Sequence, residues 1–89
     1  MKAVITVTCK DSVGIIAKVA TACAENGANI VDISQSVLQD YFAMIMLADI
    51  DSLTVGFSEF VDKLDALGEA NGLDIHAMHE DIFNTMHHI

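Results

Sequence analysis

Two short stretches of this sequence share the frame Asn-Gly-x-(Asn/Asp)-Ile, in which Asn26 and Asn71 stand 45 residues apart. Glycine can end a helix in the left-handed conformation without steric cost, so each copy is expected where a helix ends and a strand begins. This repeat predicts two strand–helix–strand units in tandem, joined by a hairpin. The two units make a βαββαβ domain, the ferredoxin-like α+β arrangement. Two helices then cover one face of a four-stranded antiparallel sheet.

The chain has 89 residues, which is enough for a single domain over 1–89 with one modest core. Runs of apolar and β-branched residues predict strands at 3–9, 30–37, 42–48 and 73–78. Helical spacing predicts a helix over about 13–25, with an inward stripe of Ile16, Val19, Ala20 and Cys23. A second helix, capped at Asp51-Ser52, has the inward stripe Phe57, Phe60, Val61, Leu64 and Leu67. A short third helix has the stripe Ile82, Phe83, Met86 and Ile89.

Side chains alternate between the faces of a strand, so the predicted sheet has one helix-covered face and one bare face. Ile5 and Val7 are expected to point toward the helices, opposite Val4, Thr6 and Thr8. In the second strand, one side is expected to carry Val31, Ile33 and Val37, and the other Asp32, Ser34 and Ser36. The third strand is apolar on both sides, so one set must leave the covered core: Phe42, Met44 and Met46, or Ala43, Ile45 and Leu47.

The set that leaves the core would form an apolar surface, which the C-terminal helix or a second subunit must cover. We therefore expect a homodimer or a higher homo-oligomer. Met44→Glu or Met46→Glu is expected to disturb this association.

Charge excludes several classes of partner. The chain has 13 acidic residues and 4 lysines, no arginine, and a formal net charge of -9. Nucleic acids and anionic membrane surfaces are attracted by basic patches, which this composition does not supply. The longest apolar run, 41–48, is far shorter than the ~20 residues of a membrane-spanning helix. We expect a cytoplasmic protein in which Cys9 and Cys23 are small core residues.

The segment between the first strand and the first helix is the candidate ligand site. A helix N-terminus offers unpaired backbone N–H groups and a partial positive charge, which suit a carboxylate. Gly14 allows close approach to the backbone, and Asp11 could hold an ammonium group. The amide of Asn29 can pair with either end of a zwitterion. The alternative is structural: Asp11 or Ser12 caps the helix, and Gly14 eases packing.

Residues 11–17, Asp-Ser-Val-Gly-Ile-Ile-Ala, followed by residues 25–32, Glu-Asn-Gly-Ala-Asn-Ile-Val-Asp, resemble the ACT domain. The similarity extends to the ACT modules of the glycine cleavage regulator and formyltetrahydrofolate deformylase, and to small stand-alone ACT proteins. It covers essentially the whole chain. The resemblance implies a dimeric regulatory domain that binds an amino acid at a subunit interface. Carried onto this sequence, the ligand-binding positions are Asp11, Ser12, Val13, Gly14, Ile15 and Asn29.

Two departures from the family pattern limit what the resemblance implies. Many family members have a basic residue or proline after the aspartate, whereas Ser12 and Val13 are neutral, so ligand specificity does not carry over. The chain also has no attached catalytic or DNA-binding domain, so any regulated partner is expected to be a separate protein.

The sequence contains few features that indicate catalysis. No nucleophile elbow is present, and the acylphosphatase alternative needs an arginine that this chain lacks. Four histidines, His76, His79, His87 and His88, lie near the C-terminus, but His76 and His79 should fall on opposite faces of a strand. We therefore expect no specific metal site and no cofactor. The leading hypothesis is a non-catalytic amino-acid-binding regulatory domain; the alternative is an assembly module of the same fold without a functional pocket.

Overall fold

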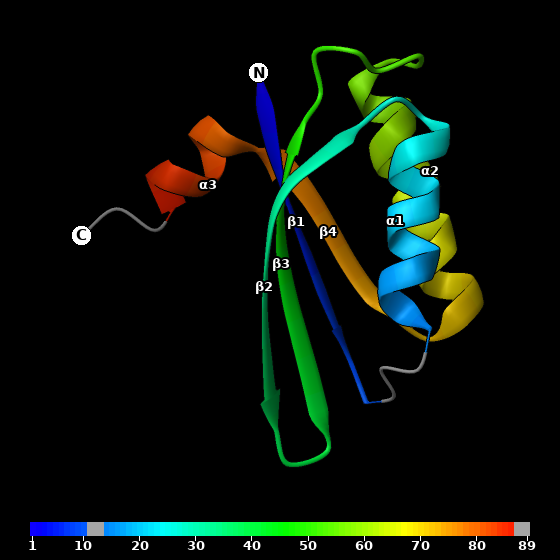
Figure 1. The fold of residues 1–89 in the computed structure, drawn as a ribbon, viewed down its shortest axis with the longest axis vertical. Coiled ribbons are helices and arrows are strands. Elements are labelled where there is room, and N and C mark those ends of the chain that lie inside the picture. The colour runs from blue at the N-terminus through cyan, green and yellow to red at the C-terminus, as the bar shows by residue number, and fades with distance from the viewer. Residues whose placement is uncertain (11–13, 87–89) are drawn as a thin grey trace.

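The computed structural model describes residues 1–10 and 14–86, and it confirms the ferredoxin-like βαββαβ fold. Four strands form one antiparallel sheet in the order β2-β3-β1-β4. Helices α1 and α2 lie together on one side of this sheet, and α3 lies on the other (Figure 1). The elements are β1 (Lys2–Cys9), α1 (Ile15–Glu25), β2 (Asn29–Leu38), β3 (Tyr41–Asp49), α2 (Phe57–Asn71), β4 (Asp74–His79) and α3 (Glu80–Met86).

The sequence repeat is a repeat of structure. The Asn26 Nδ2 group donates to the Ala22 carbonyl oxygen at 2.7 Å, and Asn71 Nδ2 donates to the Leu67 oxygen at 2.9 Å. Both bonds close the last turn of a helix, α1 in one case and α2 in the other. In each pair the equivalent residues stand 45 positions apart. In both halves of the chain, the same hydrogen bond therefore marks the passage from the helix to the following strand.

The core lies between the sheet and α1 and α2. Ile5 and Val7 of the central strand β1 are fully buried on this face, as the alternation predicts. From α2, Phe60 and Leu64 are fully buried and belong to the same cluster. Burial of side chains of this size contributes roughly 1.5–3 kcal/mol each.

Strand β3 places its methionines in this core. Met44 pairs with Val7 and Met46 with Ile5, so both methionines share the helix-covered face. Their exposed fractions are 1% and 0%, whereas that of Ile45, on the opposite face, is 46%. The expectation that Met44→Glu or Met46→Glu would test association is therefore wrong. Either change would place a carboxylate inside the core, and Ile45 belongs to the set that leaves it.

Strand β2 departs from simple alternation at a bulge. Ile30 pairs with Ala48 and Asp32 with Leu47, so Val31 is an extra residue opposite no partner. Without the bulge, Ile30 and Ile33 would point to opposite faces, because they are three residues apart. With it, both pack against the core. Val31 is half exposed and does not continue the row of Ile33 and Val37, which corrects the predicted grouping.

Helix α1 buries Val19 and Cys23 as predicted, but Ile15 rather than Ile16 is its third buried residue. Its buried residues are Ile15, Val19 and Cys23, at spacings of four, while Ile16 is 37% exposed. The N-cap residue is Gly14, and Ile15, the first residue of the helix, belongs to the core. Burial raises the pKa of the Cys23 thiol to about 11, which agrees with its predicted place in the core.

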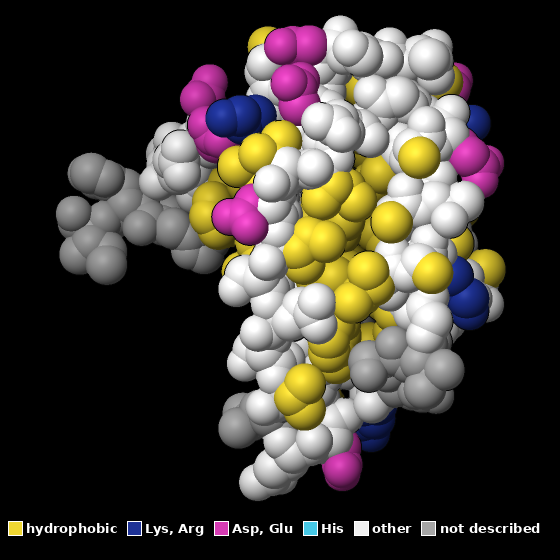
Figure 2. All heavy atoms as spheres, viewed as in Figure 1, with side chains coloured by type: hydrophobic (Ala, Val, Ile, Leu, Met, Phe, Trp, Pro, Cys, Tyr) yellow, Lys and Arg dark blue, Asp and Glu magenta, His cyan; other side chains and the backbone are white. Residues whose placement is uncertain are grey.

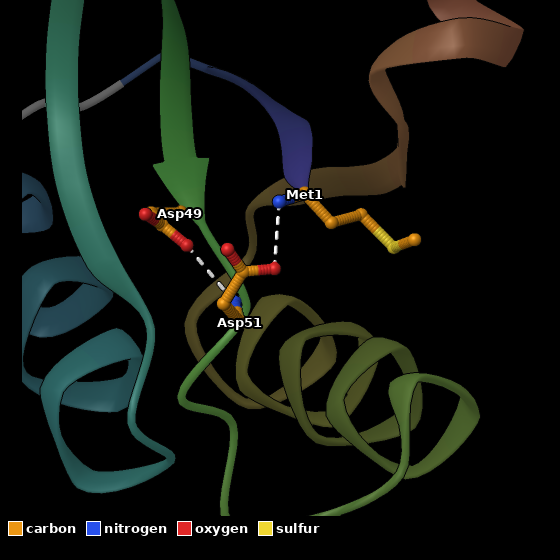
Figure 3. A network of polar contacts seen from close by, with 3 residues as sticks. All are labelled: Met1, Asp49 and Asp51. Carbon is orange, nitrogen blue, oxygen red and sulfur yellow. Dashed lines mark hydrogen bonds and ion pairs between the residues drawn. The ribbon is translucent and has the colours of Figure 1, made fainter.

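Helix α2 begins five residues after the predicted cap at Asp51-Ser52. Residues 50–56 instead cross the end of the core as an irregular segment whose Leu53 and Val55 pack against it. Asp51 accepts a hydrogen bond from the amino group of Met1 at 2.6 Å, and its own N–H donates to Asp49 Oδ1 at 2.9 Å (Figure 3). The hydrogen bond to Asp51 raises the pKa of this amino group. Asp51 thus ties the start of the chain to the end of β3.

Helix α3 covers one end of the helix-free face. It contacts β1 and β4, and Val4 on that face is only 5% exposed. The rest of the face stays open, with Ile45 and Tyr41 about half exposed. None of the described helices is long and apolar enough to cross a membrane. Ile89, predicted in the α3 stripe, lies outside the described residues.

Candidate ligand site

The candidate ligand site begins where β1 gives way to α1. Gly14 has φ +72°, in the left-handed region that glycine occupies readily, and its carbonyl accepts the first helical hydrogen bond from the Lys18 N–H at 3.1 Å. A Cβ on Gly14 would meet no atom within 4 Å among the described residues. The positive φ, rather than a tight contact, is therefore the requirement for glycine at this position.

The first turn of α1 offers backbone donors and contains no acidic residue of its own. The opening N–H groups of a helix have no intrahelical acceptor, and they carry the positive end of the helix dipole. No acidic residue lies in this first turn, and the N-cap glycine has no side chain to cap it. The side chain of Ile15 is 3% exposed and belongs to the core, so only its backbone faces a ligand. Such a terminus suits a carboxylate.

Of the predicted site residues that the structure describes, Gly14 and Ile15 lie together, and Asn29 lies away from them. Asn29 begins β2, pairs with Asp49 and has an exposed side chain. Gly14 stands at the other end of α1 (Figure 1). Eleven helical residues, at ~1.5 Å each, separate the two ends by about 16 Å. Asp11, Ser12 and Val13 lie outside the described residues. Within one chain, Gly14 and Asn29 are therefore too far apart to contact the same amino acid.

A cavity that sequence reasoning missed lies between α1 and α2. Its volume is about 520 Å³. The lining residues are Lys18, Thr21, Ala22, Glu25, Asn26, Lys63, Ala66 and Leu67. Lys18 Nζ donates to Asn71 Oδ1 at 2.9 Å, which links α1 to the end of α2. The signal that could have found this cavity is the 45-residue spacing itself, because it also separates Lys18 from Lys63.

The two described histidines point to opposite faces, as expected. His76 pairs with Thr6 across the sheet, and its Nε2 atom lies 3.0 Å from Asp74 Oδ1, with both side chains exposed. His79 pairs with Ala3, and its ring lies 4.4 Å from that of Phe57, between ring centroids. Among residues 1–10 and 14–86, no group of three or more His, Cys, Asp or Glu side chains could hold a metal ion.

Both the sequence and the fold of this chain are similar to those of known proteins. The family model described as the ACT domain matches residues 2–78. A UPF0237 protein of Clostridium acetobutylicum is 47% identical over 89 residues, which is 100% of both chains. The structure of an ACT domain protein from Streptococcus pneumoniae superimposes with a TM-score of 0.82, at 40% identity over 93% of each chain.

A formyltetrahydrofolate deformylase from Pseudomonas syringae has a TM-score of 0.77 at 23% identity, and it shares the fold. The match covers 88% of this chain and 27% of that enzyme, so one module of the larger protein has this architecture.

Proposed function

This chain belongs to the ACT domain family, and from that premise we propose that it is a non-catalytic regulatory domain that binds an amino acid between two copies of itself. ACT domains are typically regulatory ligand-binding modules, and the C. acetobutylicum relative is matched over its full length. The single observation that carries the proposal is the N-terminus of α1. It has an open Gly14 and no acidic residue in its first turn, an arrangement that favours a carboxylate.

The distance between Gly14 and Asn29 indicates how two copies would meet. Val37 pairs with Phe42, and Phe42 pairs with Cys9, so the C-terminal part of β2 lies at the end of the sheet where β1 ends. If two β2 strands pair antiparallel about a two-fold axis, the start of one lies beside the end of the other. Asn29 of one protomer is then brought toward Gly14 of its partner.

The surface beside β2 is suited to this pairing. Strand β2 is an edge strand of ten residues whose single charged side chain is Asp32. Edge strands that avoid pairing usually carry lysine or proline, and β2 has neither. The adjacent flank of α1 carries Ile16, Ala20 and Ala24, at helical spacing and without charge. Figure 2 shows hydrophobic side chains gathered in a band between β2 and α1.

The proposed ligand contacts follow from this arrangement. The first-turn amides at Gly14 and Ile15 receive the carboxylate, Asp11 holds the ammonium group, and Asn29 of the partner hydrogen-bonds to the ligand. Ser12 and Val13 are further proposed ligand contacts. Occupancy would stabilise the pair and be reported to a separate regulated protein, since an allosteric signal needs a second coupled site.

The alternative function is assembly without a ligand. One observation favours this alternative: the side chain of Ile15, one of the six predicted ligand contacts, is buried in the core. Calorimetric titration of the folded protein with the twenty amino acids distinguishes the amino-acid-binding function from the assembly function. Heat with one or a few amino acids supports the sensor, whereas a folded oligomer that binds none of them supports the assembly module.

A complementation experiment tests whether the site spans two chains. Asp11→Ala and Asn29→Ala should each weaken amino-acid binding by roughly 10–100-fold, from the loss of a hydrogen bond to a charged group, with little change in melting temperature. Each mixed dimer of the two variants has one doubly altered site and one intact site. An equal mixture should therefore recover about one quarter of the wild-type sites. No recovery would show that both residues act within one chain, or not on the ligand at all.

A further inference from the structure

Strand β4 has a free edge, on the side of the sheet away from β2. It ends the strand order β2-β3-β1-β4, and β1 is its only partner strand among the described residues (Figure 1). In the same part of the chain, the backbone hydrogen bonds outside the helices and the sheet involve none of residues 74–77. Every second residue of an edge strand turns its N–H and C=O groups outward, where another strand can pair with them. β4 also has neither lysine nor proline, the residues that commonly block such pairing.

The flank of α2 beside this edge is acidic. The buried residues of α2 are Phe60, Leu64 and Gly68. Asp65 and Glu69 each come one position after a member of this stripe, and both side chains are exposed. One position turns ~100° around a helix, so the two carboxylates stand on the same flank, four residues apart. Lys63 and Leu67 come one position before the stripe and stand on the opposite flank, where they line the cavity toward α1.

A cavity of about 300 Å³ connects this acidic flank with β4. Its lining residues are Asp65, Glu69, Leu73, Asp74, Ile75 and His76, without a lysine. Asp74 pairs with Thr8, whose neighbour Val7 is buried in the core, so Asp74 lies on the helix-free face of the sheet. Carboxylates thus flank the free edge on both faces. An added strand, whose side chains alternate between the faces, meets a negative charge on either one.

The charges around the two sheet edges favour different partners. The flank of α1 beside β2 carries Ile16, Ala20 and Ala24, none of them charged. A second copy paired through β4 would instead bring its own Asp65, Glu69 and Asp74 against those of the first. Like charges across an interface oppose association, and the chain already has a net charge of -9. A strand that carries lysine or arginine has the complementary charge and can pair with these carboxylates.

We propose that the outer edge of β4 binds a basic extended segment of another protein, as a fifth strand whose lysine or arginine side chains lie beside Asp65 and Glu69. Backbone hydrogen bonds to β4 hold such a segment, and its alternate side chains select it. The regulated protein would thereby gain a contact that leaves β2 free for the second copy. The proposal does not rest on the amino-acid site, because Asn29 belongs to the other edge of the sheet.

A peptide of four Lys-Val repeats, acetylated and amidated so that its ends are uncharged, tests this edge. At about 0.05 M salt, where screening is weak, we expect a dissociation constant on the order of 1 mM. Amide chemical shifts should change at residues 74–77 and at Asp65 and Glu69, and not along β2. A Glu-Val peptide of the same length should not bind. A peptide with its central valines replaced by proline keeps the charge but cannot pair as a strand, and it should bind about tenfold more weakly.

The chain offers a matched pair of double variants, each of which removes two exposed carboxylates. Asp65→Asn combined with Glu69→Gln should weaken binding of the Lys-Val peptide by about tenfold. Glu25→Gln combined with Asp40→Asn lowers the net charge equally but lies away from β4, and it should change binding by less than about twofold. All four side chains are exposed, so both double variants should fold as the wild type does, which circular dichroism checks.

Three results would overturn the proposal. These are no binding of the Lys-Val peptide up to about 10 mM, equal binding of the proline-containing peptide, or an equal effect of the two double variants. Asn29→Ala should leave peptide binding unchanged, so the amino-acid site and the β4 edge can fail separately.

Discussion

Asn26 and Asn71 show how much a single side chain decides at a helix end. Each caps the last turn of its helix through its Nδ2 group, and each is followed by a glycine with positive φ: +81° at Gly27 and +68° at Gly72. The Asn-Gly frame predicts these helix ends because each asparagine hydrogen-bonds to a residue four positions before it in the same chain. Local hydrogen bonds of this kind need no tertiary partner.

The five glycines allow a graded test of this residue-scale argument. Gly27→Ala should be the most destabilising, by about 3 kcal/mol, because the new Cβ would overlap the backbone oxygen of Ser52 at a positive φ. Gly72→Ala should cost about 1 kcal/mol, since it has the positive φ but open space. Gly56→Ala, with φ -64° and open space, is the control and should change stability by less than ~0.5 kcal/mol.

Urea unfolding of the three variants measures these differences. Equal stability of Gly27→Ala and Gly56→Ala would show that the segment after β3 does not press against Gly27.

The sequence does not predict which of two neighbouring residues is buried where burial depends on the rotation of a helix. Ile15 and Ile16 are adjacent and identical in type, so either one fits an apolar stripe. Ile15 is the buried one of the two, and Val19 and Cys23 follow it at four-residue intervals. A difference of one position moves a side chain by about 100° around the helix, and no local signal sets that angle.

At the scale of elements, β3 carries the clearest test. It alternates Met44 and Met46 toward the helices with Ile45 toward the other face. Met46→Glu should lose more than about 4 kcal/mol of stability or fail to fold, because it buries an unpaired carboxylate. Ile45→Glu should change stability by less than ~1 kcal/mol, since the side chain is 46% exposed.

Circular dichroism and urea titration of the two variants provide the measurement. If Ile45→Glu unfolds the chain as Met46→Glu does, the helix-free face is covered in the folded state, and the assignment of faces in β3 needs revision.

Element boundaries were predicted well for the strands and poorly for the start of α2. Asp51 and Ser52 have the residue types of a helix cap, yet Asp51 binds the amino group of Met1. That partner lies fifty positions away in the sequence, so the competition between the two roles is invisible locally. The bulge at Val31 also depends on tertiary packing, because it allows both Ile30 and Ile33 to pack against the same core.

For the whole molecule, the net charge of -9 opposes any association of identical chains. Salt screens this repulsion, since the Debye length falls from ~30 Å at 0.01 M to ~10 Å at 0.1 M. We expect the dissociation constant of the homo-oligomer to fall by roughly tenfold over this range, because the proposed α1–β2 surface has few charged groups. Light scattering after size exclusion measures the mass at each salt concentration. Dissociation by added salt would instead mean that ion pairs hold the chains together.

The sequence by itself determined the fold class and the elements, because the repeat, the alternation in the strands and the Asn-Gly junctions act over a few residues. It also pointed to the first turn of α1 as a place for a carboxylate. Only the tertiary structure decided that Gly14 and Asn29 lie at opposite ends of α1, that Met44 and Met46 of β3 are buried while Ile45 is not, and that a cavity opens between α1 and α2. These facts depend on how distant segments pack, and packing distances are set by three-dimensional contacts that no local pattern encodes.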